Sequence, residues 1–528
     1  MPFTASLTDM NLLKKSLLSF FFLVIITLIV LWALTKSIKP EAIKDIINHQ
    51  LLTLTSQKSR INGDISWQLF PRPGIKINNI QIGDENATDI YSISIDDLLF
   101  NVQIPPLLRG KLVFNELKID GFKIRINPAA PASTPVTVSK VSVQTITSKK
   151  STAYSSAQFV IDSVLLTHGQ ISIVGVPEQI LLSGLQIGAS QLNLKNQFFP
   201  IQLKGDLSAS TPTQTLTANI NFKGRTQMTR QIFSNLVSAL HNSTTEGQFQ
   251  VQDLQINKLK IDKINANVKT DAEELILNPL NTSLYNGESV GDLRFNFTSG
   301  KLAINQTATG IDASPLFKAL LTKPLMKGSL DFSVHASTNL HDHGWQTNFR
   351  GNGGITVKDG VLYFVDIHKL ITDITQKTHL LVEENLGSKV VLQLGENLPV
   401  AYQRGKTKFH LISVQYRIQQ AMLIDDSLLL QTDELQLKGQ GQINLLDFTI
   451  NNELSAKLLN ADKIIEDIQK YLDGSLPFKL LGQLSNPQIL PDAQKITPLL
   501  SQYLVKKTFA KPVKQLKTTL KKLFDELS

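Results

Sequence analysis

The sequence predicts a mainly β protein: an N-terminal transmembrane helix, then antiparallel β-sheet with a few helices, and a C-terminal amphipathic helix. Three observations lead to this fold class. Residues 16–35 are an uncharged apolar run, apolar residues recur at every second position through most of the chain, and residues 493–528 combine many lysines with apolar residues at helical spacing. Strands with one apolar face, joined by Gly, Asp and Asn, are typical of antiparallel sheets.

The composition excludes several classes of protein. The chain has 528 residues, of which 42% are hydrophobic, and it has no cysteine. It therefore can hold no disulfide, thiolate zinc site or iron–sulfur cluster, and only histidines and carboxylates remain as metal ligands. The apolar fraction is sufficient for a core. A thiol-free chain of this length fits an oxidising compartment.

Residues 1–15 are a short N-terminal tail, and residues 16–35 form the predicted transmembrane helix. A helix of about 20 apolar residues crosses the ~30 Å hydrocarbon core of a bilayer. Lys15 before the run and Trp32 and Lys36 at its end are typical interface anchors. A cleaved signal peptide is the alternative, but its shorter apolar part would be followed by small residues. We therefore expect a single-span anchor.

The lysines beside the span do not decide its orientation, because two precede it and Lys36, Lys39 and Lys44 follow it. Long domains translocate largely regardless of charge. The missing cysteines and the β architecture favour the outer side of the membrane. In a Gram-negative source this side is the periplasm, so we expect a single-pass inner-membrane protein with its C-terminal body in the periplasm.

Residues 36–127 form a first β region. After a short predicted helix at 40–58, apolar residues alternate with polar ones such as Lys76, Lys118 and Lys123. This period of two predicts strands with one apolar face. The alternating positions are Ile75, Ile77, Ile80, Ile82, Ile93, Ile95, Leu112, Phe114, Leu117, Ile119, Phe122, Ile124 and Ile126.

Residues 128–157 are rich in Pro, Ala, Ser and Thr and predict a linker or a long loop. Residues 158–492 form a second β body, with predicted helical insertions at 229–241 and 361–385. Its strand patterns follow at irregular spacing, which excludes a solenoid of fixed period. One pattern is repeated: Leu117, Ile119, Phe122, Ile124 and Ile126 are echoed by Val164, Leu166, Gly169, Ile171 and Ile173.

Residues 493–528 form a predicted basic amphipathic helix. Phe509, Leu516 and Leu523 are among its apolar residues at helical spacing. One interpretation is that the helix lies on an anionic membrane surface or binds an acidic partner; the other is that it caps the sheet with its lysines in solvent. The candidate membrane-surface residues are Lys514, Lys517, Lys521 and Lys522.

The apolar faces of the strands need a cover, and the predicted helices are too few to supply it. A sandwich or a barrel is the ordinary solution. The alternative is a long curved sheet whose concave apolar face holds lipid chains. Periodicity alone does not choose between them. The candidate lipid-facing residues are Ile75, Ile77, Ile93, Ile95, Phe122, Ile124, Ile126, Ile171, Ile173, Ile443 and Leu445.

No motif predicts an enzyme or a metalloprotein. The segment 287–291 matches the G-x-S-x-G pattern of hydrolases, but alternating apolar residues follow it where that motif requires a helix. The segment 405–407 lacks the first glycine of a phosphate-binding loop. His335 and the 341–343 segment (His, Asp, His) fit a polar turn better than a metal site. We expect no catalytic residue, cofactor or metal ion, and no nucleic-acid partner.

Many short motifs across residues 10–492 together resemble the AsmA family of Gram-negative envelope proteins. The opening motif is Ile61, Asn62, Gly63, Asp64, Ile65, Phe70, Pro71, Gly74, Ile75, Ile77, Asn79, Ile80 and Ile82. Later motifs are Val113 to Ile126; Leu284, Tyr285, Asn286, Gly287 and Gly291; Gly353, Gly354, Ile355, Val357, Asp359, Gly360 and Leu362; Thr407, Phe409, Leu411, Asp426, Leu428, Gly439, Gly441 and Ile443; and Leu476, Pro477, Phe478, Gly482, Leu484 and Pro487.

The resemblance implies an inner-membrane anchor, a periplasmic β-rich body and a role in outer-membrane assembly. Related proteins are viewed as bridge-like lipid carriers, in which phospholipid tails slide along a groove. The resemblance therefore implies an elongated, curved antiparallel β-sheet groove with a few helices and not a sandwich or a barrel. We therefore expect a non-enzymatic protein of outer-membrane assembly or homeostasis that binds or transports phospholipid or another envelope lipid. Its expected partners are that lipid, the inner membrane, and outer-membrane or periplasmic assembly proteins. The alternative is a membrane-anchored structural or regulatory module with a closed β core that acts through protein contacts.

Overall fold

A computed structural model describes residues 59–127, 158–373 and 405–496, with gaps at 69–71, 84–90, 108, 110–112, 175–178, 194, 230–241, 346, 462, 472–473 and 493. The predicted N-terminal tail, transmembrane helix, 40–58 helix and 128–157 linker lie outside the described residues. So does the predicted C-terminal helix, apart from residues 494–496, which are helical. Among the described residues, no helix is long and apolar enough to cross a membrane.

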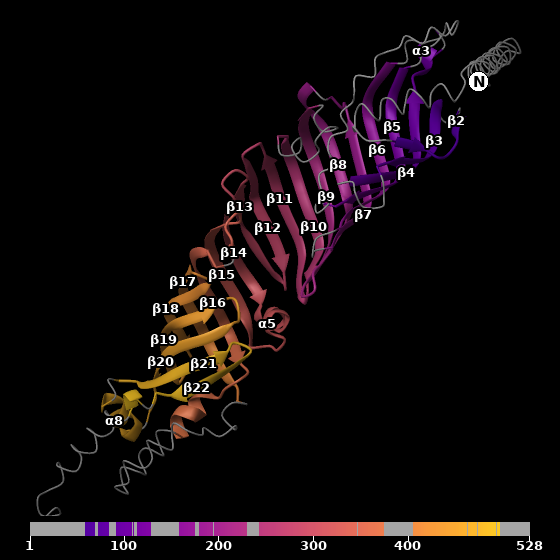
Figure 1. Cartoon of the computed structure of the whole chain (residues 1–528). Helices are drawn as coiled ribbons and strands as arrows, with labels where there is room; N and C mark the ends of the chain where they lie inside the picture. Colours follow the sequence, from indigo (N-terminus) through magenta and orange to yellow (C-terminus); the bar gives the residue numbers. More distant parts are fainter. Residues whose placement is uncertain are drawn as a thin grey trace, which may run out of the picture. The chain divides into compact units, whose positions relative to one another are not determined.

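The described residues are mainly β, as the alternation predicts (Figure 1). The helices are α3 (Ile104–Leu107), α5 (Ala313–Leu321) and α8 (Lys463–Tyr471). The strands are β1 (Ser59–Ile61), β2 (Ile65–Gln68), β3 (Gly74–Ile82), β4 (Tyr91–Val102), β5 (Val113–Ile126), β6 (Gln158–Ile173), β7 (Gln179–Ser190), β8 (Lys195–Ser210), β9 (Thr215–Thr229), β10 (Thr244–Ile256), β11 (Leu259–Thr270), β12 (Glu274–Leu284), β13 (Gly287–Asn296), β14 (Lys301–Asp312), β15 (Met326–Asn339), β16 (Arg350–Leu362), β17 (Thr407–Gln419), β18 (Met422–Gln431), β19 (Leu435–Asn444), β20 (Thr449–Leu458), β21 (Leu476–Gln483) and β22 (Asn486–Pro491).

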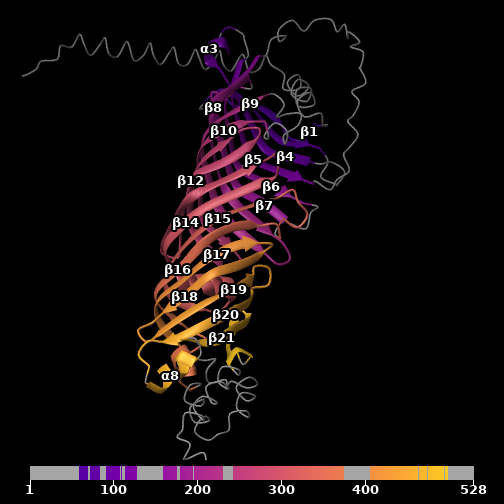
Figure 2. The same cartoon turned by 90° about the vertical axis from the view of Figure 1, so that its left-hand side faces the viewer.

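The chain divides into two compact units, which are described separately. Unit 1 comprises Met1–Asn257 and Val268–Ala272, and unit 2 comprises Lys258–Asn267 and Glu273–Ser528. In unit 1, β1 and β2 both pair with β3, and each strand from β3 to β9 pairs with the next. In unit 2, each strand from β12 to β21 pairs with the next. Within each unit the strands therefore form one curved, open layer (Figures 1 and 2).

The prediction of a purely antiparallel sheet is wrong at one place, because β5 and β6 are parallel. A parallel connection needs a crossover of about a dozen residues or more, and residues 128–157 lie between these two strands. The pairing also explains the repeated pattern in the sequence. Leu117 lies beside Val164 and Ile124 beside Ile171, so the two copies of the pattern lie next to each other in the same phase.

A line of backbone irregularities crosses unit 1 from strand to strand. Asn79 on β3, Gly121 on β5, His168 on β6 and Gly184 on β7 all have positive φ. At each of these residues the inward-facing positions are three residues apart instead of two. For example, Asn79 lies between Ile77 and Ile80, and Gly121 lies between Ile119 and Phe122. Bulges of this kind bend a strand and increase its twist. The line therefore bends the sheet of unit 1 while the apolar positions stay on one face.

The core of unit 1 lies on one face of its sheet, which we call the inner face; the opposite face of each sheet is its outer face. Ile75, Ile77 and Ile80 on β3 are almost completely buried, together with Phe114 and Phe122 on β5. Lys76, next to Ile75, forms a surface ion pair with Asp97. Alternation along each strand thus separates the apolar face from the charged face, as predicted.

The core of unit 2 lies between its inner face and short helical segments. Asp312 caps α5 by accepting a hydrogen bond from the backbone N–H of Ser314 (3.1 Å), and Leu321 at the other end of α5 is buried in the core. The predicted insertion at 361–385 is helical over 367–373 and contributes Leu370 and Ile371 to the same core. Of the insertion predicted at 229–241, only residue 229 is described, and it belongs to β9.

We predict that Gly169→Ala destabilises unit 1 whereas Gly188→Ala does not. A Cβ atom at Gly169 would overlap the ring of Phe122, but a Cβ at Gly188 would meet no atom within 4 Å. Overpacking of this kind costs about 1–3 kcal/mol of the free energy of unfolding, and a substitution without a clash changes it by about 0.5 kcal/mol or less. Hydrogen exchange of the β5–β7 amides measures both effects. Equal protection in the two variants would contradict the packing of Phe122 against Gly169.

Candidate functional site

A continuous apolar row crosses the inner face of unit 1. Residues that lie opposite each other on paired strands point to the same face of the sheet. The strand registers align eight apolar residues in this way, one on each strand from β3 to β10. This unit 1 apolar row consists of Ile77, Leu98, Ile119, Leu166, Ile187, Leu203, Phe222 and Phe249.

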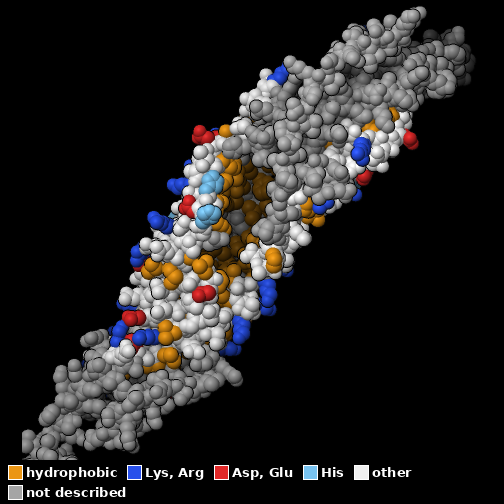
Figure 3. Space-filling model, in the orientation of Figure 1, with side chains coloured by type: hydrophobic (Ala, Val, Ile, Leu, Met, Phe, Trp, Pro, Cys, Tyr) orange, Lys and Arg blue, Asp and Glu red, His pale blue; other side chains and the backbone are white. Residues whose placement is uncertain are grey.

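The burial of this row changes along the sheet. Ile77 is 0% exposed and Leu98 is 4% exposed, because both belong to the core. The six residues from Ile119 on β5 to Phe249 on β10 are only partly buried. This row is therefore closed at β3 and β4 and partly exposed along the later strands. The space-filling view, which draws both units, shows hydrophobic side chains gathered in a hollow and charged side chains on the surface around it (Figure 3).

The structure brings most of the candidate lipid-facing residues together on this inner face. Ile93, Ile124 and Ile171 are neighbours in one cross-strand row, and Ile126 and Ile173 are neighbours in the next. All five are partly buried. The other four candidates of unit 1 lie in the closed core, where protein side chains cover them: Ile75, Ile77, Ile95 and Phe122.

The inner face of unit 2 has the same organisation. A row of apolar residues under α5 and the 367–373 helix is buried on every strand from β14 to β21. The candidate Ile443 belongs to a different row, in which Ile443 and Leu423 on β18 are partly buried and Ile450 on β20 is buried. The candidate Leu445 is not on a strand but follows β19, where its N–H donates to the carbonyl oxygen of Ala421 (2.8 Å). The buried row, called here the helix-covered row, is Ile311, Leu330, Val357, Ile412, Leu430, Leu437, Ala456 and Leu476.

One row of the inner face of unit 2 is polar, and the sequence analysis did not identify it. It runs across the strands between the helix-covered row and the row of Ile443. Its register is continuous through Leu280, Gly291, Gln306, Val334, Gly353, Tyr416, Asp425, Gly441 and Asn452. The signal in the sequence was the presence of glycines at inward positions of otherwise apolar strands. We use the name polar row for Gln306, Tyr416, Asp425 and Asn452.

Three side chains of the polar row lie flat across a glycine of the neighbouring strand. Gln306 on β14 crosses Gly291 on β13 and donates from Nε2 to the carbonyl oxygen of Leu280 on β12 (3.1 Å). A Cβ at that glycine would clash with the amide group of Gln306. The arrangement recurs twice: Tyr416 crosses Gly353 to donate to the carbonyl oxygen of Ser333 (2.9 Å), and Asn452 crosses Gly441 to donate to Oδ2 of Asp425 (2.6 Å).

Burial changes the titration of two members of the polar row. It raises the pKa of the Asp425 carboxyl, against hydrogen bonds from Gly441 and Asn452 that lower it. It also raises the pKa of the Tyr416 hydroxyl. The next residue, Asp426, lies on the outer face, where a two-point hydrogen bond from Arg417 (2.7 and 2.8 Å) lowers the pKa of its carboxyl. Two adjacent aspartates therefore have opposite shifts.

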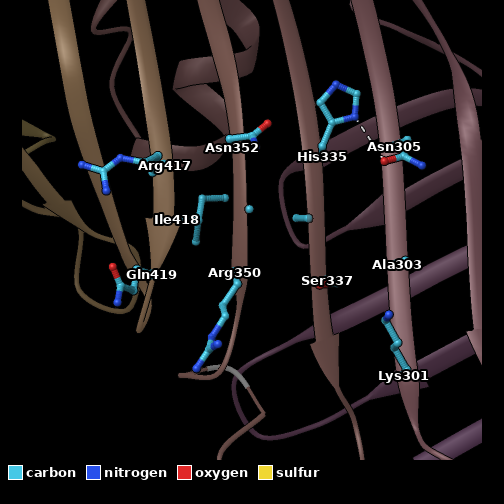
Figure 4. Close-up of a pocket in the computed structure, with 12 residues that line it drawn as sticks. Lys301, Ala303, Asn305, His335, Ser337, Arg350, Asn352, Arg417, Ile418 and Gln419 are labelled. Atoms are coloured by element: carbon cyan, nitrogen blue, oxygen red, sulfur yellow. Dashed lines mark hydrogen bonds between the residues drawn. The ribbon is translucent and has the colours of Figure 1, made fainter.

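The outer face of unit 2 carries a shallow trough of about 660 Å³ across β14 to β17 (Figure 4). Nδ1 of His335 lies 3.1 Å from Oδ1 of Asn305, and Lys301 and Arg350 add positive charge at its edge. The guanidinium of Arg417 in this trough is already paired with Asp426. These side chains are ordinary residues of a charged outer face and do not form a catalytic set.

The rejected motifs have structural roles. Ser289 of the G-x-S-x-G segment lies within β13, and the turn before it is the two-residue loop Tyr285–Asn286, both with positive φ, as in a tight hairpin. Thr407 of the 405–407 segment accepts a hydrogen bond from the N–H of Ile367 (3.0 Å) and donates one to the carbonyl oxygen of Val365 (2.8 Å). Neither segment has the strand–turn–helix geometry of a catalytic or phosphate-binding loop.

Two other groups of residues from the sequence analysis are the histidine segment, for which a polar turn was expected, and the lysines of the C-terminal helix. In the part of the chain that the structure describes, no group of three His, Asp or Glu residues could hold a metal ion. His335 lies on β15, whereas His341, Asp342 and His343 lie in the loop after it. The candidate membrane-surface residues Lys514, Lys517, Lys521 and Lys522 lie outside the described residues.

We predict that Asp425→Asn and Asp426→Asn change the pH dependence of stability in opposite directions. The raised pKa of Asp425 gives a stabilisation that is complete below the unfolded pKa, about 3.9, and is lost as the pH rises through the folded pKa. The wild type should therefore lose stability relative to Asp425→Asn as the pH rises above about 4. The lowered pKa of Asp426 has the opposite sign: its stabilisation is present above the unfolded pKa and is lost as the pH falls. Urea unfolding of the full chain, followed by pulse proteolysis at each pH, measures both differences; parallel curves for the three proteins would contradict the assignment.

Comparison with known proteins gives one family. The family model described as the AsmA family matches residues 10–252 and 241–428, which is most of the chain. No curated protein and no solved structure is significantly similar to it. The matched range includes the inner face of unit 1 and, in unit 2, the strands from β12 to β17. On the strength of this match and of the open β-sheet with one apolar face, the chain belongs to the AsmA family.

Proposed function

We propose that this protein is a non-enzymatic envelope protein that binds the acyl chains of phospholipid on the inner faces of its sheets and carries them in outer-membrane assembly or homeostasis. Residues 16–35 would anchor it in the inner membrane, with the β body in the periplasm. The absence of cysteine and the uncharged run support this placement. Membership of the AsmA family agrees with an envelope role.

The observation that carries the proposal is the open part of the unit 1 apolar row. Six consecutive strands present Ile119, Leu166, Ile187, Leu203, Phe222 and Phe249 to one side, partly exposed and without a charged residue among them. A continuous exposed apolar surface in a folded protein marks a binding site. Its neighbours on the strands, such as Lys204 and Lys223, face the other way and are exposed, so the surface around the row stays in water.

The energetics suit a carrier. Each methylene group removed from water contributes about 0.8 kcal/mol, so an acyl chain with a dozen covered methylenes gains on the order of 10 kcal/mol before ordering costs. This is enough to hold a chain on the protein. Because similar apolar side chains repeat on every strand, a chain that moves by one strand exchanges one set of contacts for an equivalent one. The free energy change of such a step is therefore small compared with that of leaving the groove.

A structural module with a closed core is the second candidate, and the buried parts of each unit favour it there. The side chains around Ile77 and the helix-covered row leave no room for a ligand. Such a module would act through protein contacts and would carry no lipid. The two candidates therefore differ in what touches the open part of the inner face.

Site-specific photocrosslinking in cells tests the contact directly. A photoreactive amino acid at Phe222 on the inner face should form a lipid adduct that mass spectrometry identifies after digestion. The same amino acid at Lys223, the next residue on the same strand, faces outward and should give little or none. Equal lipid labelling at both positions, or none at either, would leave the carrier proposal without its main support.

Polar substitutions separate an open groove from a dry core. We expect Ile124→Asn and Ile443→Asn, at partly buried inner positions, to lower the lipid bound to the purified full chain at least several-fold while hydrogen exchange stays close to wild type. Ile77→Asn, at a completely buried position, should instead unfold unit 1, because an unpartnered amide in a core is costly.

The matched controls are Lys123→Asn and Gln442→Asn, which place the same amide on the outer face of β5 and β19. They should leave lipid occupancy and hydrogen exchange unchanged. If Ile124→Asn unfolds unit 1 as Ile77→Asn does, that part of the inner face is a core and not a groove.

A further inference from the structure

The polar row is an anomaly on an apolar face. Gln306 is 7% exposed, Tyr416 7%, Asp425 4% and Asn452 1%. The rows on either side are apolar, with Ile304, Ile418 and Leu423 on one side and Phe332 and Val414 on the other.

The hydrogen bonds of the polar row are asymmetric. Each of the three crossing side chains donates its proton to an acceptor within the wall of the sheet. In contrast, three acceptor atoms have no hydrogen-bond partner among the described residues: Oε1 of Gln306, Oδ1 of Asp425 and Oδ1 of Asn452. Buried polar atoms are nearly always paired. The row therefore presents three acceptor oxygens without a partner, whereas the amide nitrogens of Gln306 and Asn452 and the hydroxyl of Tyr416 each already donate one hydrogen bond.

The glycines decide where these side chains lie. Because Gly291, Gly353 and Gly441 have no Cβ, each crossing side chain can lie directly against the backbone of the neighbouring strand. The polar atoms are thereby held in one line. Neighbouring strands lie about 4.8 Å apart, so the line from β14 to β20 is roughly 29 Å long. It runs across the strands in the same direction as the apolar rows beside it.

We propose that the polar row is a recognition line for acyl chains that carry a hydrogen-bond donor, either a hydroxyl group or an amide N–H. This inference rests on the proposed function, since the chain itself is held by the apolar rows. The donor of the ligand pairs with the free acceptor oxygens when the chain separates the side chains of the flanking rows. An ester-linked, unsubstituted acyl chain has only acceptors and would leave the three oxygens unpaired.

The direction of the line has a consequence for movement. A ligand that advances along the apolar rows stays at the same distance from the polar row. Its donor can pass from Asn452 and Asp425 towards Gln306 without its chain leaving the apolar surface. The row would thus favour a ligand with a hydrogen-bond donor without blocking ordinary acyl chains. An ordinary acyl chain leaves the three acceptor oxygens unpaired, as they are in the empty protein, and therefore adds no new penalty.

Competition between two fatty acids tests the proposal. The full chain in maltoside micelles is incubated with an equimolar mixture of stearic acid and 12-hydroxystearic acid, and native mass spectrometry gives the ratio of the two bound acids. One net hydrogen bond corresponds to about a three- to tenfold preference. We expect the wild type to favour the hydroxylated acid by this factor relative to the double variant Asp425→Leu with Asn452→Leu. Both partners are replaced by apolar residues of similar size, so that no orphaned group remains.

The matched control is Asn451→Leu, the same substitution one residue earlier on β20 but on the outer face, where the residue is exposed. It should keep the wild-type ratio. Gln306→Met, a second test at the other end of the line, should lower the ratio on its own. It also keeps the proposal testable if the double variant does not fold.

The outcomes separate the two proposals. If both acids bind but the ratio is the same in the wild type, the control and the polar-row variants, the recognition line is wrong and the apolar groove stands. If the control loses the preference together with the double variant, the effect is not specific to the inner face and the inference is again wrong. If neither acid binds to any form, the proposed function fails and the inference fails with it.

Discussion

The alignment of apolar positions across successive strands is the constraint on which the rest of this structure depends. A slip of one residue in any pairing would turn the whole apolar set of that strand to the outer face. The registers avoid this even where strands bulge. Between Asp425 and Leu428 on β18 the register shifts, yet both residues remain on the inner face. The irregularities at Asn79 and Gly121 act in the same way in unit 1.

The bulges therefore have two effects that reinforce each other. Each bulge adds one residue, so that the apolar residues before and after it stay on the same face of the sheet. Each bulge also bends its strand, which curves the sheet. A flat sheet would expose its apolar face fully, whereas a curved sheet shelters that face and leaves its charged face in water. This explains how an open layer of strands remains a folded protein without a second sheet to cover it in the described part of either unit.

Each unit combines a closed core with an open apolar face, and the difference lies in what covers the sheet. In unit 2, α5 and the 367–373 helix cover the helix-covered row. In unit 1, Ile61 on β1 is buried in the core of β3 to β5, and Ile65 and Trp67 on β2 pack against that core. Away from these covers the same strands continue with partly buried apolar residues. The closed part supplies stability, and the open part is available for a ligand.

The sequence by itself determined the class of fold and the faces of the strands, because a period of two depends only on local geometry. It also contained the repeat of 117–126 at 164–173, but only the structure showed that the two copies are parallel neighbours. That pairing depends on a crossover of about 30 residues, and the sequence pattern is the same for either strand direction.

Only the tertiary structure decided which apolar residues are covered. Ile77 and Ile124 both lie in segments where apolar and polar residues alternate, yet Ile77 is completely buried and Ile124 is only partly buried. The polar row also required the structure, because Gln306, Tyr416, Asp425 and Asn452 come from strands β14 to β20 and are aligned only through six consecutive strand pairings. Periodicity assigns a residue to a face, but burial and alignment depend on contacts between strands that are distant in sequence.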